Sequence, residues 1–185
     1  MSVAEHKAHS PSPAGVRVAL LTASDSRPVG DNEGGRVLRA LTEEAGFTVA
    51  GEALLREDEA ALRAHVAALA ASGTVDAVLI TGGTGLAPRD RTPEALGPLF
   101  ERRLDGFGEL VRALSFAEIG PAAMLSRAEA GGVSGVLVFL MPGSPSAVRL
   151  AMQRLVVPEL AHAVGQLRRA PRVEETAAHG PRDRA

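Results

Sequence analysis

A glycine-rich segment followed by a carboxylate is the part of the sequence best suited to chemistry. Residues 81–85 are Thr-Gly-Gly-Thr-Gly, and Asp90 follows shortly after them. Gly82, Gly83, Thr84 and Gly85 can bring backbone N–H groups close to an anion, because glycine has no Cβ to obstruct the approach. A carboxylate beside a bound anion is repelled unless a cation lies between them, so Asp90 indicates Mg²⁺. The alternatives are a turn that only reverses the chain and a carboxylate at a helix N-terminus.

Small polar loops follow three other apolar runs. Ser24 and Asp25 offer a hydroxyl and a carboxylate to a polar ligand, with a local turn as an equally plausible role. Asp58 could supply a second carboxylate, although from the sequence alone a helix N-cap is its more frequent role. The last run leads into Pro142, Gly143 and Ser144. Because parallel strands deliver their carboxyl-terminal loops to one edge of a sheet, we expect these loops to meet the glycine segment there.

The composition excludes several other chemistries. Lys7 is the only lysine and no Gly-Lys-Ser/Thr motif is present, so neither a Walker A loop nor a Schiff base in the core is available. Cysteine is absent, which removes disulfides, thiolate metal sites and cysteine nucleophiles. The five histidines show no convincing metal-ligand spacing. Bound phosphate must therefore be held by backbone N–H groups, arginine or a metal ion.

Charge and hydropathy point to a soluble, cytoplasmic protein. The formal net charge of −2 gives no basis for binding a polyanion, so nucleic acid is not expected as a partner. No segment reaches the ~20 apolar residues of a membrane span, and the first fifteen residues have no apolar signal region. The lack of cysteine is consistent with a reducing compartment.

Short apolar runs alternate with helical patterns between two polar ends. Such alternation predicts an α/β fold, a three-layer α/β/α sandwich with a mainly parallel central sheet. We expect one domain over residues 15–168 and disordered tails at 1–14 and 169–185. Gly46 and Gly73 are expected to end helices, and Thr92 to N-cap one that Gly97 and Pro98 interrupt. The expected strands are 16–22, 47–55, 75–81 and 136–141, and the expected helices are 34–45, 58–72, 92–97, 107–119, 145–157 and 158–167.

Several short motifs, taken in order, resemble those of the molybdenum-cofactor biosynthesis fold over about residues 16–167. The overall run is most similar to the branch called molybdenum cofactor biosynthesis protein B, which is related to molybdopterin adenylyltransferase and the gephyrin G domain. The motifs are Leu21-Thr-Ala-Ser-Asp-Ser26, Thr81-Gly-Gly-Thr-Gly85 with Arg89-Asp90 and Thr92-Pro93-Glu94, Asp105-Gly-Phe-Gly-Glu109, Leu114-Ser-Phe-Ala-Glu-Ile-Gly120, Met124-Leu-Ser-Arg127 and Met141-Pro-Gly-Ser-Pro145.

The resemblance implies a reaction that joins AMP from ATP to the terminal phosphate of molybdopterin with Mg²⁺, releasing pyrophosphate. It also implies that Asp58 and Asp90 form the acidic pair that holds the metal, that the glycine loop holds the ligand, and that Ser126 lines the same cleft. The sequence departs from the usual pattern at Gly34, where serine is common, and at Arg91, where an aliphatic residue is common. Arg91 is expected either to bind phosphate or to be solvated.

The resemblance also implies a homo-oligomer, a trimer or a hexamer. Two other functions remain open. One is a non-catalytic molybdopterin-binding partner that holds the precursor for other molybdenum-cofactor enzymes. The other is an isolated domain of the molybdenum insertase type, which ranks last because the chain has no room for the extra domains of that enzyme.

Overall fold

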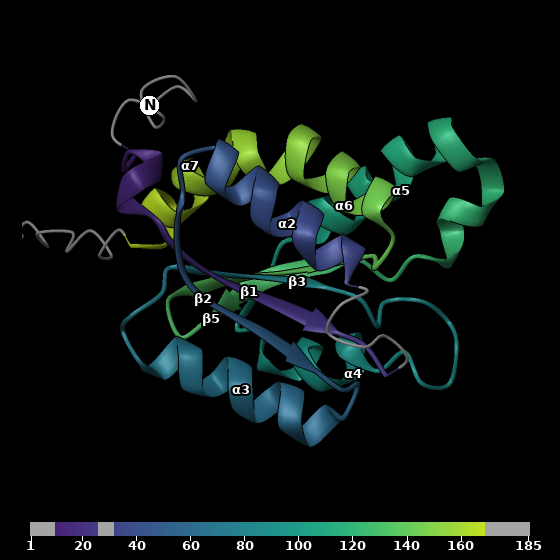
Figure 1. The fold of residues 1–185 in the computed structure, drawn as a ribbon, viewed down its shortest axis with the longest axis horizontal. Coiled ribbons are helices and arrows are strands. Elements are labelled where there is room, and N and C mark those ends of the chain that lie inside the picture. Colours follow the sequence, from purple (N-terminus) through teal and green to yellow (C-terminus); the bar gives the residue numbers. More distant parts are fainter. Residues whose placement is uncertain (1–9, 26–31, 169–185) are drawn as a thin grey trace, which may run out of the picture.

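The computed structural model describes residues 10–25 and 32–168, which form a six-stranded sheet between two layers of helices (Figure 1). The sheet order is β2-β1-β3-β6-β5-β4. The first four strands are parallel to one another, and β5 pairs antiparallel with both of its neighbours, β6 and β4. The predicted α/β/α architecture with a mainly parallel sheet is therefore confirmed. The strands are β1 (Arg17–Ala23), β2 (Thr48–Leu55), β3 (Ala77–Thr81), β4 (Arg102–Arg103), β5 (Glu129–Val133) and β6 (Val136–Met141).

The two helical layers bury opposite faces of the same strands. Successive side chains of a strand point to opposite faces. Accordingly, Leu20 of β1 packs in one core with Leu38, and Leu21 packs in the other with Leu62. One layer contains α2 (Glu33–Glu44), α5 (Asp105–Ile119), α6 (Pro145–Ala151), the π-helical turn η5 (Met152–Val156) and α7 (Val157–Leu167). The other contains α3 (Glu59–Ala71), α4 (Thr92–Leu96) and the 3₁₀ turn η3 (Gly97–Leu99).

The helix ends follow the expected signals with two exceptions. Gly46 and Gly73 adopt positive φ at the position after the C-caps of α2 and α3, where they end these helices as predicted. Thr92 is the first residue of α4 and makes no capping hydrogen bond, so the predicted N-cap is wrong by one position. The last helix, α7, begins at Val157, one residue before the predicted start at Pro158, and the π-helical turn η5 joins it to α6. Proline lacks an N–H and crowds the carbonyl four residues earlier, a defect that a π turn absorbs.

The sequence did not predict β4 and β5. Strand β5 contains Gly131 and Gly132, which disfavour a strand. In the fold Gly131 is needed, because a Cβ there would lie 2.6 Å from the Phe100 ring and 2.7 Å from the carbonyl oxygen of Arg102. A tight turn then joins β5 to β6 through Ser134 and Gly135, both at positive φ.

The predicted tails lie largely outside the described residues. Among the described residues of the N-terminal segment, Pro13–Gly15 form the 3₁₀ turn η1. The Ala14 carbonyl accepts a 2.9 Å hydrogen bond from the Thr48 hydroxyl at the start of β2. Among the described helices, none combines the length and the apolar character needed to cross a membrane.

Candidate functional site

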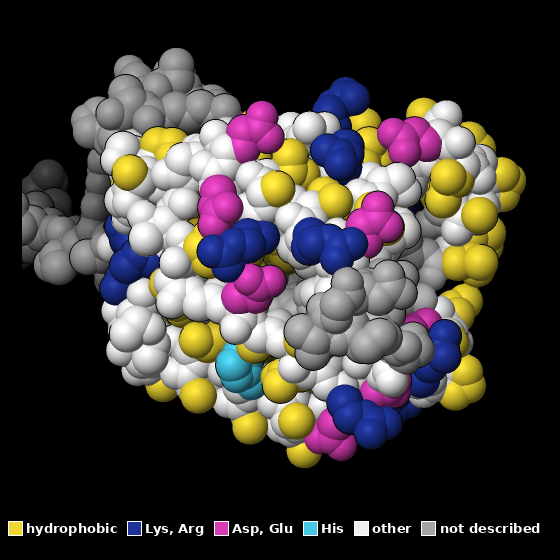
Figure 2. Space-filling model, viewed as in Figure 1, with side chains coloured by type: hydrophobic (Ala, Val, Ile, Leu, Met, Phe, Trp, Pro, Cys, Tyr) yellow, Lys and Arg dark blue, Asp and Glu magenta, His cyan; other side chains and the backbone are white. Residues whose placement is uncertain are grey.

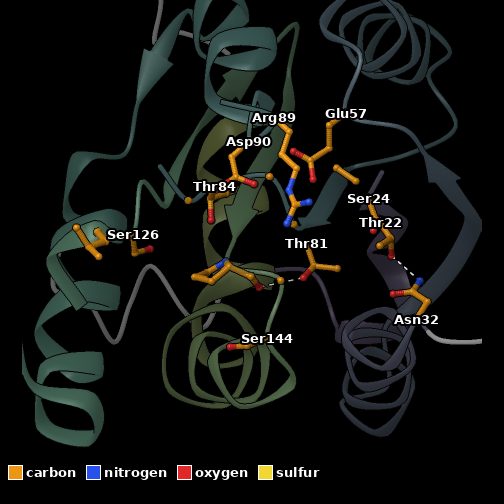
Figure 3. A pocket seen from close by; sticks show the side chains of 17 residues that line it. Thr22, Ser24, Asn32, Glu57, Thr81, Thr84, Arg89, Asp90, Ser126 and Ser144 are labelled. Carbon is orange, nitrogen blue, oxygen red and sulfur yellow. Dashed lines mark hydrogen bonds between the residues drawn. The ribbon is translucent and has the colours of Figure 1, made fainter. Parts of the chain in front are cut away.

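A cavity of about 400 Å³ opens where β1, β3 and β6 end (Figure 3). The strand pairing aligns Thr22 with Thr81, and Thr81 with Met141, so these carboxyl ends lie on one rim as predicted. The chain leaves β1 toward β2 on one side and returns to β3 on the other, which makes this rim a switch point of the sheet. Ligands of open α/β sheets bind at such points.

Two hydrogen bonds fix the walls of the cavity. The Thr81 hydroxyl donates to the Pro142 carbonyl at 3.0 Å and ties the end of β3 to the loop after β6. The Asn32 side-chain amide donates to the Thr22 hydroxyl at 2.8 Å and ties the N-terminus of α2 to β1. Most of the residues predicted for the site line this cavity, namely Ser24, Gly82, Gly83, Thr84, Gly85, Asp90, Ser126, Pro142, Gly143 and Ser144.

Asp58 and Asp25 do not line the cavity, so their expected placement there is corrected. The Asp58 carboxylate is exposed and accepts the Ala61 N–H at 2.8 Å, which confirms its alternative role as the N-cap of α3. The Asp25 carboxylate accepts the Glu57 N–H at 3.1 Å and Arg56 Nε at 3.4 Å. The carboxylate that this loop sends into the cavity is that of Glu57, one residue before Asp58.

The glycine loop takes a path that only glycine can follow. Gly82 has φ +102°, and a Cβ there would lie 2.1 Å from the carbonyl oxygen of Ala23. Gly83 has φ +64°, and its Cβ would lie 2.2 Å from the Thr92 hydroxyl and 2.9 Å from Glu57 Oε2. The loop therefore packs directly against β1, α4 and the cavity carboxylate.

Carbonyl groups of the glycine loop accept hydrogen bonds from the protein, whereas three of its N–H groups donate none within the described residues. The carbonyls of Gly83 and Thr84 accept the N–H groups of Thr92 and Arg127, at 3.1 and 2.9 Å. The N–H groups of Gly83, Thr84 and Gly85 have no acceptor within residues 10–25 and 32–168. Consecutive amides of this kind form a concave anion-binding surface.

Glu57 and Asp90 form an acidic pair against this loop. Burial, together with the nearby charge of Asp90, raises the pKa of Glu57 to about 7, although a hydrogen bond from the Arg91 backbone and the charge of Arg89 oppose the increase. Glu57 Oε2 is buried and has no hydrogen-bond partner among the described residues. The other carboxylate approaches Gly85, since a Cβ on that glycine would lie 2.5 Å from Asp90 Oδ2.

This pair fits a Mg²⁺ ion that is also held by the ligand. Carboxylate oxygens are the side-chain ligands that Mg²⁺ prefers, and Mg²⁺ is commonly bound through one or two of them together with substrate phosphates. The described residues contain no group of three or more acidic, histidine or cysteine side chains that could hold a metal without such help. Glu57 and Asp90 would then be the two protein ligands.

Two arginines near the site have different positions. Arg89 is the one cationic side chain among the described residues that line the cavity, and Figure 3 shows it beside Asp90 and Glu57. In the sequence Arg89 stands out only as part of a motif; its place between the glycine loop and Asp90 is the signal that could have identified it. Arg91 lies outside the cavity lining and pairs with Glu59, its Nε donating to Oε1 at 2.7 Å.

Gly34, the other departure from the usual pattern, has a packing reason. A Cβ at this position would lie 2.7 Å from the Gly143 carbonyl oxygen, on the loop that follows β6. Glycine thus allows the N-terminus of α2 to approach the cavity wall closely.

The comparisons with known proteins identify the family. The family described as "Probable molybdopterin binding domain" matches residues 19–162. Molybdenum cofactor biosynthesis protein B of Bacillus subtilis is 45% identical over 91% of this chain and 99% of its own, and that of Escherichia coli is 48% identical over 78% and 85%. This chain belongs to the molybdenum cofactor biosynthesis protein B family.

Solved structures agree with this assignment. A crystal structure of a molybdenum cofactor biosynthesis protein B superposes with a TM-score of 0.80 at 42% identity, covering 85% of this chain and 98% of that one. The tungsten cofactor synthesizing protein MoaB from Pyrococcus furiosus gives a TM-score of 0.75 at 30% identity, covering 85% and 99%. The family places this chain in molybdenum cofactor biosynthesis with a molybdopterin-binding domain, as the motifs predicted.

Proposed function

We propose that this chain transfers AMP from ATP to the terminal phosphate of molybdopterin, with Mg²⁺ bound by Glu57 and Asp90. The observation that carries the proposal is the placement of the two carboxylates against the glycines of a loop whose amides are unoccupied. A site for an anion alone would not contain two carboxylates, whereas a site for a phosphate and a divalent cation requires both kinds of group.

The reaction needs position and charge more than covalent chemistry from the protein. A phosphate oxygen of molybdopterin attacks the α-phosphorus of ATP, and the bond from that phosphorus to the bridging oxygen of pyrophosphate breaks. The loop amides hold phosphate oxygens by hydrogen bonds, and Arg89 offsets negative charge as it accumulates. When bound, Mg²⁺ neutralises the charge on the phosphates. Ser24, Ser126 and Ser144 line the cavity and offer hydroxyls to the polar edges of the ligands.

The test is Mg²⁺-dependent release of pyrophosphate from ATP and molybdopterin, with Mn²⁺ as a probe of metal binding. Asp90→Asn and Glu57→Gln keep the shape of each side chain but remove the charge, and each should slow turnover roughly 100-fold or more. Asp58→Asn is the matched control, because it makes the same change next to Glu57 but outside the cavity. Asparagine also caps helices, so this variant should keep both its fold and its rate.

Three outcomes decide the proposal. Loss of turnover and of Mn²⁺ binding in the two cavity variants, with an unchanged control, supports it. If the unmodified protein binds molybdopterin but releases no pyrophosphate, the non-catalytic binding partner replaces the enzyme. If both cavity variants keep the rate, adenylyl transfer stands but the assignment of the metal ligands is wrong.

We also propose that the chain acts as a homo-oligomer, a trimer or a hexamer, in the cytoplasm. The support is an exposed apolar surface on α5 and the 3₁₀ turn η4 (Gly120–Leu125), where the side chains of Phe116, Ile119 and Met124 are 60%, 59% and 75% exposed. Figure 2 shows hydrophobic atoms gathered at the end of the molecule where α5 lies. Sedimentation at micromolar concentration should show an oligomer, and a monomer alone would overturn this part of the proposal.

A further inference from the structure

Arg127 holds the ligand loop at several points from outside the cavity. Its Nε donates to the Gly85 carbonyl at 2.9 Å, and one terminal nitrogen donates to the Asp90 carbonyl at 2.7 Å. The other terminal nitrogen pairs with Glu94 on α4. The Arg127 backbone N–H adds a fourth contact, to the Thr84 carbonyl at 2.9 Å. Arg127 is not among the residues that line the cavity, although its neighbour Ser126 is.

The orientation of a peptide group links these contacts to the ligand site. The C=O and N–H of a trans peptide point in opposite directions from one rigid plane. When Arg127 holds the carbonyls of Thr84 and Gly85, the amides that follow them, those of Gly85 and Leu86, face the other side of the loop. Arg127 therefore orients two amides of the loop, those of Gly85 and Leu86.

The same reasoning extends to the acidic pair. The Asp90 carbonyl and the Arg91 N–H belong to one peptide group, whose carbonyl Arg127 holds. Burial raises the pKa of Glu57, and the Arg91 backbone N–H acts in the opposite direction. A single guanidinium thus holds the backbone at Gly85 and at Asp90, and it orients the Arg91 N–H.

We propose that Arg127 is a positioning residue that preorganises the loop of residues 83–91 for its anionic ligand, acting through the backbone without touching the ligand. The inference rests on the proposed function for the identity of the ligand, a nucleotide phosphate with a divalent cation. A planar fork with several donors is required, because three acceptors lie around one side chain. Lysine carries the charge but has no fixed fork, so it cannot replace arginine here.

The chain offers a matched control at the opposite edge of the sheet. Arg17 also makes several contacts through one guanidinium, to the Asp76 carboxylate at 3.0 and 3.2 Å and to the Gly73 carbonyl at 2.9 Å. Arg17→Met therefore removes a comparable set of interactions from a place that does not touch the loop. A second comparison, Glu94→Gln, weakens the ion pair of Arg127 but leaves its contacts with the loop carbonyls.

The experiment measures hydrogen exchange of the full chain and its affinity for ATP with Mg²⁺, both well below the melting temperature of each variant. In Arg127→Met, amides of residues 83–91 should exchange at least about tenfold faster, and the Kd for ATP should rise about tenfold or more. Arg127→Lys should resemble Arg127→Met. Arg17→Met should lower the melting temperature but leave both the loop exchange and the Kd unchanged, and Glu94→Gln should change them much less than Arg127→Met.

The two readouts separate this inference from the proposed function. Unchanged loop exchange and unchanged affinity in Arg127→Met would overturn the positioning role, and so would full rescue by lysine. An equal effect of Glu94→Gln would also overturn it, because the ion pair would then be the cause. If the unmodified protein does not bind ATP, the proposed function fails, and the exchange comparison still decides the role of Arg127.

Discussion

Replacing Glu57 by glutamine should stabilise the protein, and more so as the pH rises. Burial, with the charge of Asp90, raises the pKa of Glu57 from an ordinary 4.5 to about 7 in the folded protein. The folded state thus binds this proton more tightly than the unfolded state does. The resulting stabilisation is fully present below pH 4.5 and is lost as the pH rises to about 7.

The structure sets the size of the effect. One pKa unit corresponds to about 1.4 kcal/mol, so the change from 4.5 to about 7 gives a ceiling of roughly 3 kcal/mol. Glu57 is only half-buried, and solvent screening reduces this value to about 1 to 2 kcal/mol. For a chain of this length, that difference corresponds to roughly 2 to 8 °C in the melting temperature.

The assay is a series of thermal melts from pH 4.5 to pH 8 in EDTA, so that no divalent cation binds the carboxylates. Glutamine has nearly the shape of protonated glutamate, so the two proteins should melt together at the acid end. The melting temperature of Glu57→Gln should then exceed that of the unmodified protein by an amount that grows toward the alkaline end. A difference that stays constant with pH, or reverses its sign, would refute the reasoning.

Two further predictions concern a glycine of the ligand loop and a buried carboxylate at the opposite edge of the sheet. Gly82→Ala should destabilise the fold by about 2 to 4 kcal/mol in urea unfolding, since its Cβ would meet the Ala23 carbonyl; Gly51→Ala, where a Cβ meets nothing within 4 Å, should not. Burial raises the pKa of Asp76, but hydrogen bonds, chiefly from Arg17, lower it to about 2. At neutral pH, the free energy of unfolding of Asp76→Asn should therefore be lower than that of the unmodified protein by up to about 2 kcal/mol. In thermal melts, this difference should disappear as the pH falls from 3.8 to about 2.

The sequence predicted β1, β3 and β6 because these parallel strands are buried on both faces. A continuous apolar run such as residues 136–141, too short for a helix and bounded by helical patterns, is typical of a buried strand. Strand β5 gave no such signal, since Gly131 is there to accommodate Phe100 and Arg102 across the sheet. Contacts between segments distant in the sequence, and not local propensity, determine this edge of the sheet.

The sequence predicted which strand ends form the rim of the site, but not which individual side chains enter the cavity. Glycines and small polar residues after strands identify the rim, because topology alone brings strand ends together. Among adjacent carboxylates, however, the sequence does not show which one enters the cavity. Asp58 suits an N-cap, and once it caps α3 the preceding Glu57 faces the loop. The sequence likewise does not show which of Arg89 and Arg91 enters the cavity. In the structure Arg91 forms an ion pair with Glu59, and Arg89 lines the cavity.

The raised pKa of Glu57 is itself an argument about what the cavity binds. A carboxylate with a buried oxygen that lacks a partner lowers stability, and a second carboxylate nearby adds to that cost. If Glu57 served only to pack against the loop, glutamine would fill the same space without the charge. A divalent cation would remove the repulsion between the carboxylates of Glu57 and Asp90, and it would coordinate the buried Glu57 Oε2 that has no hydrogen-bond partner. Cation binding should therefore reverse the stability order of the two proteins above the pKa of Glu57, so that with saturating Mg²⁺ and ATP the unmodified chain melts above Glu57→Gln.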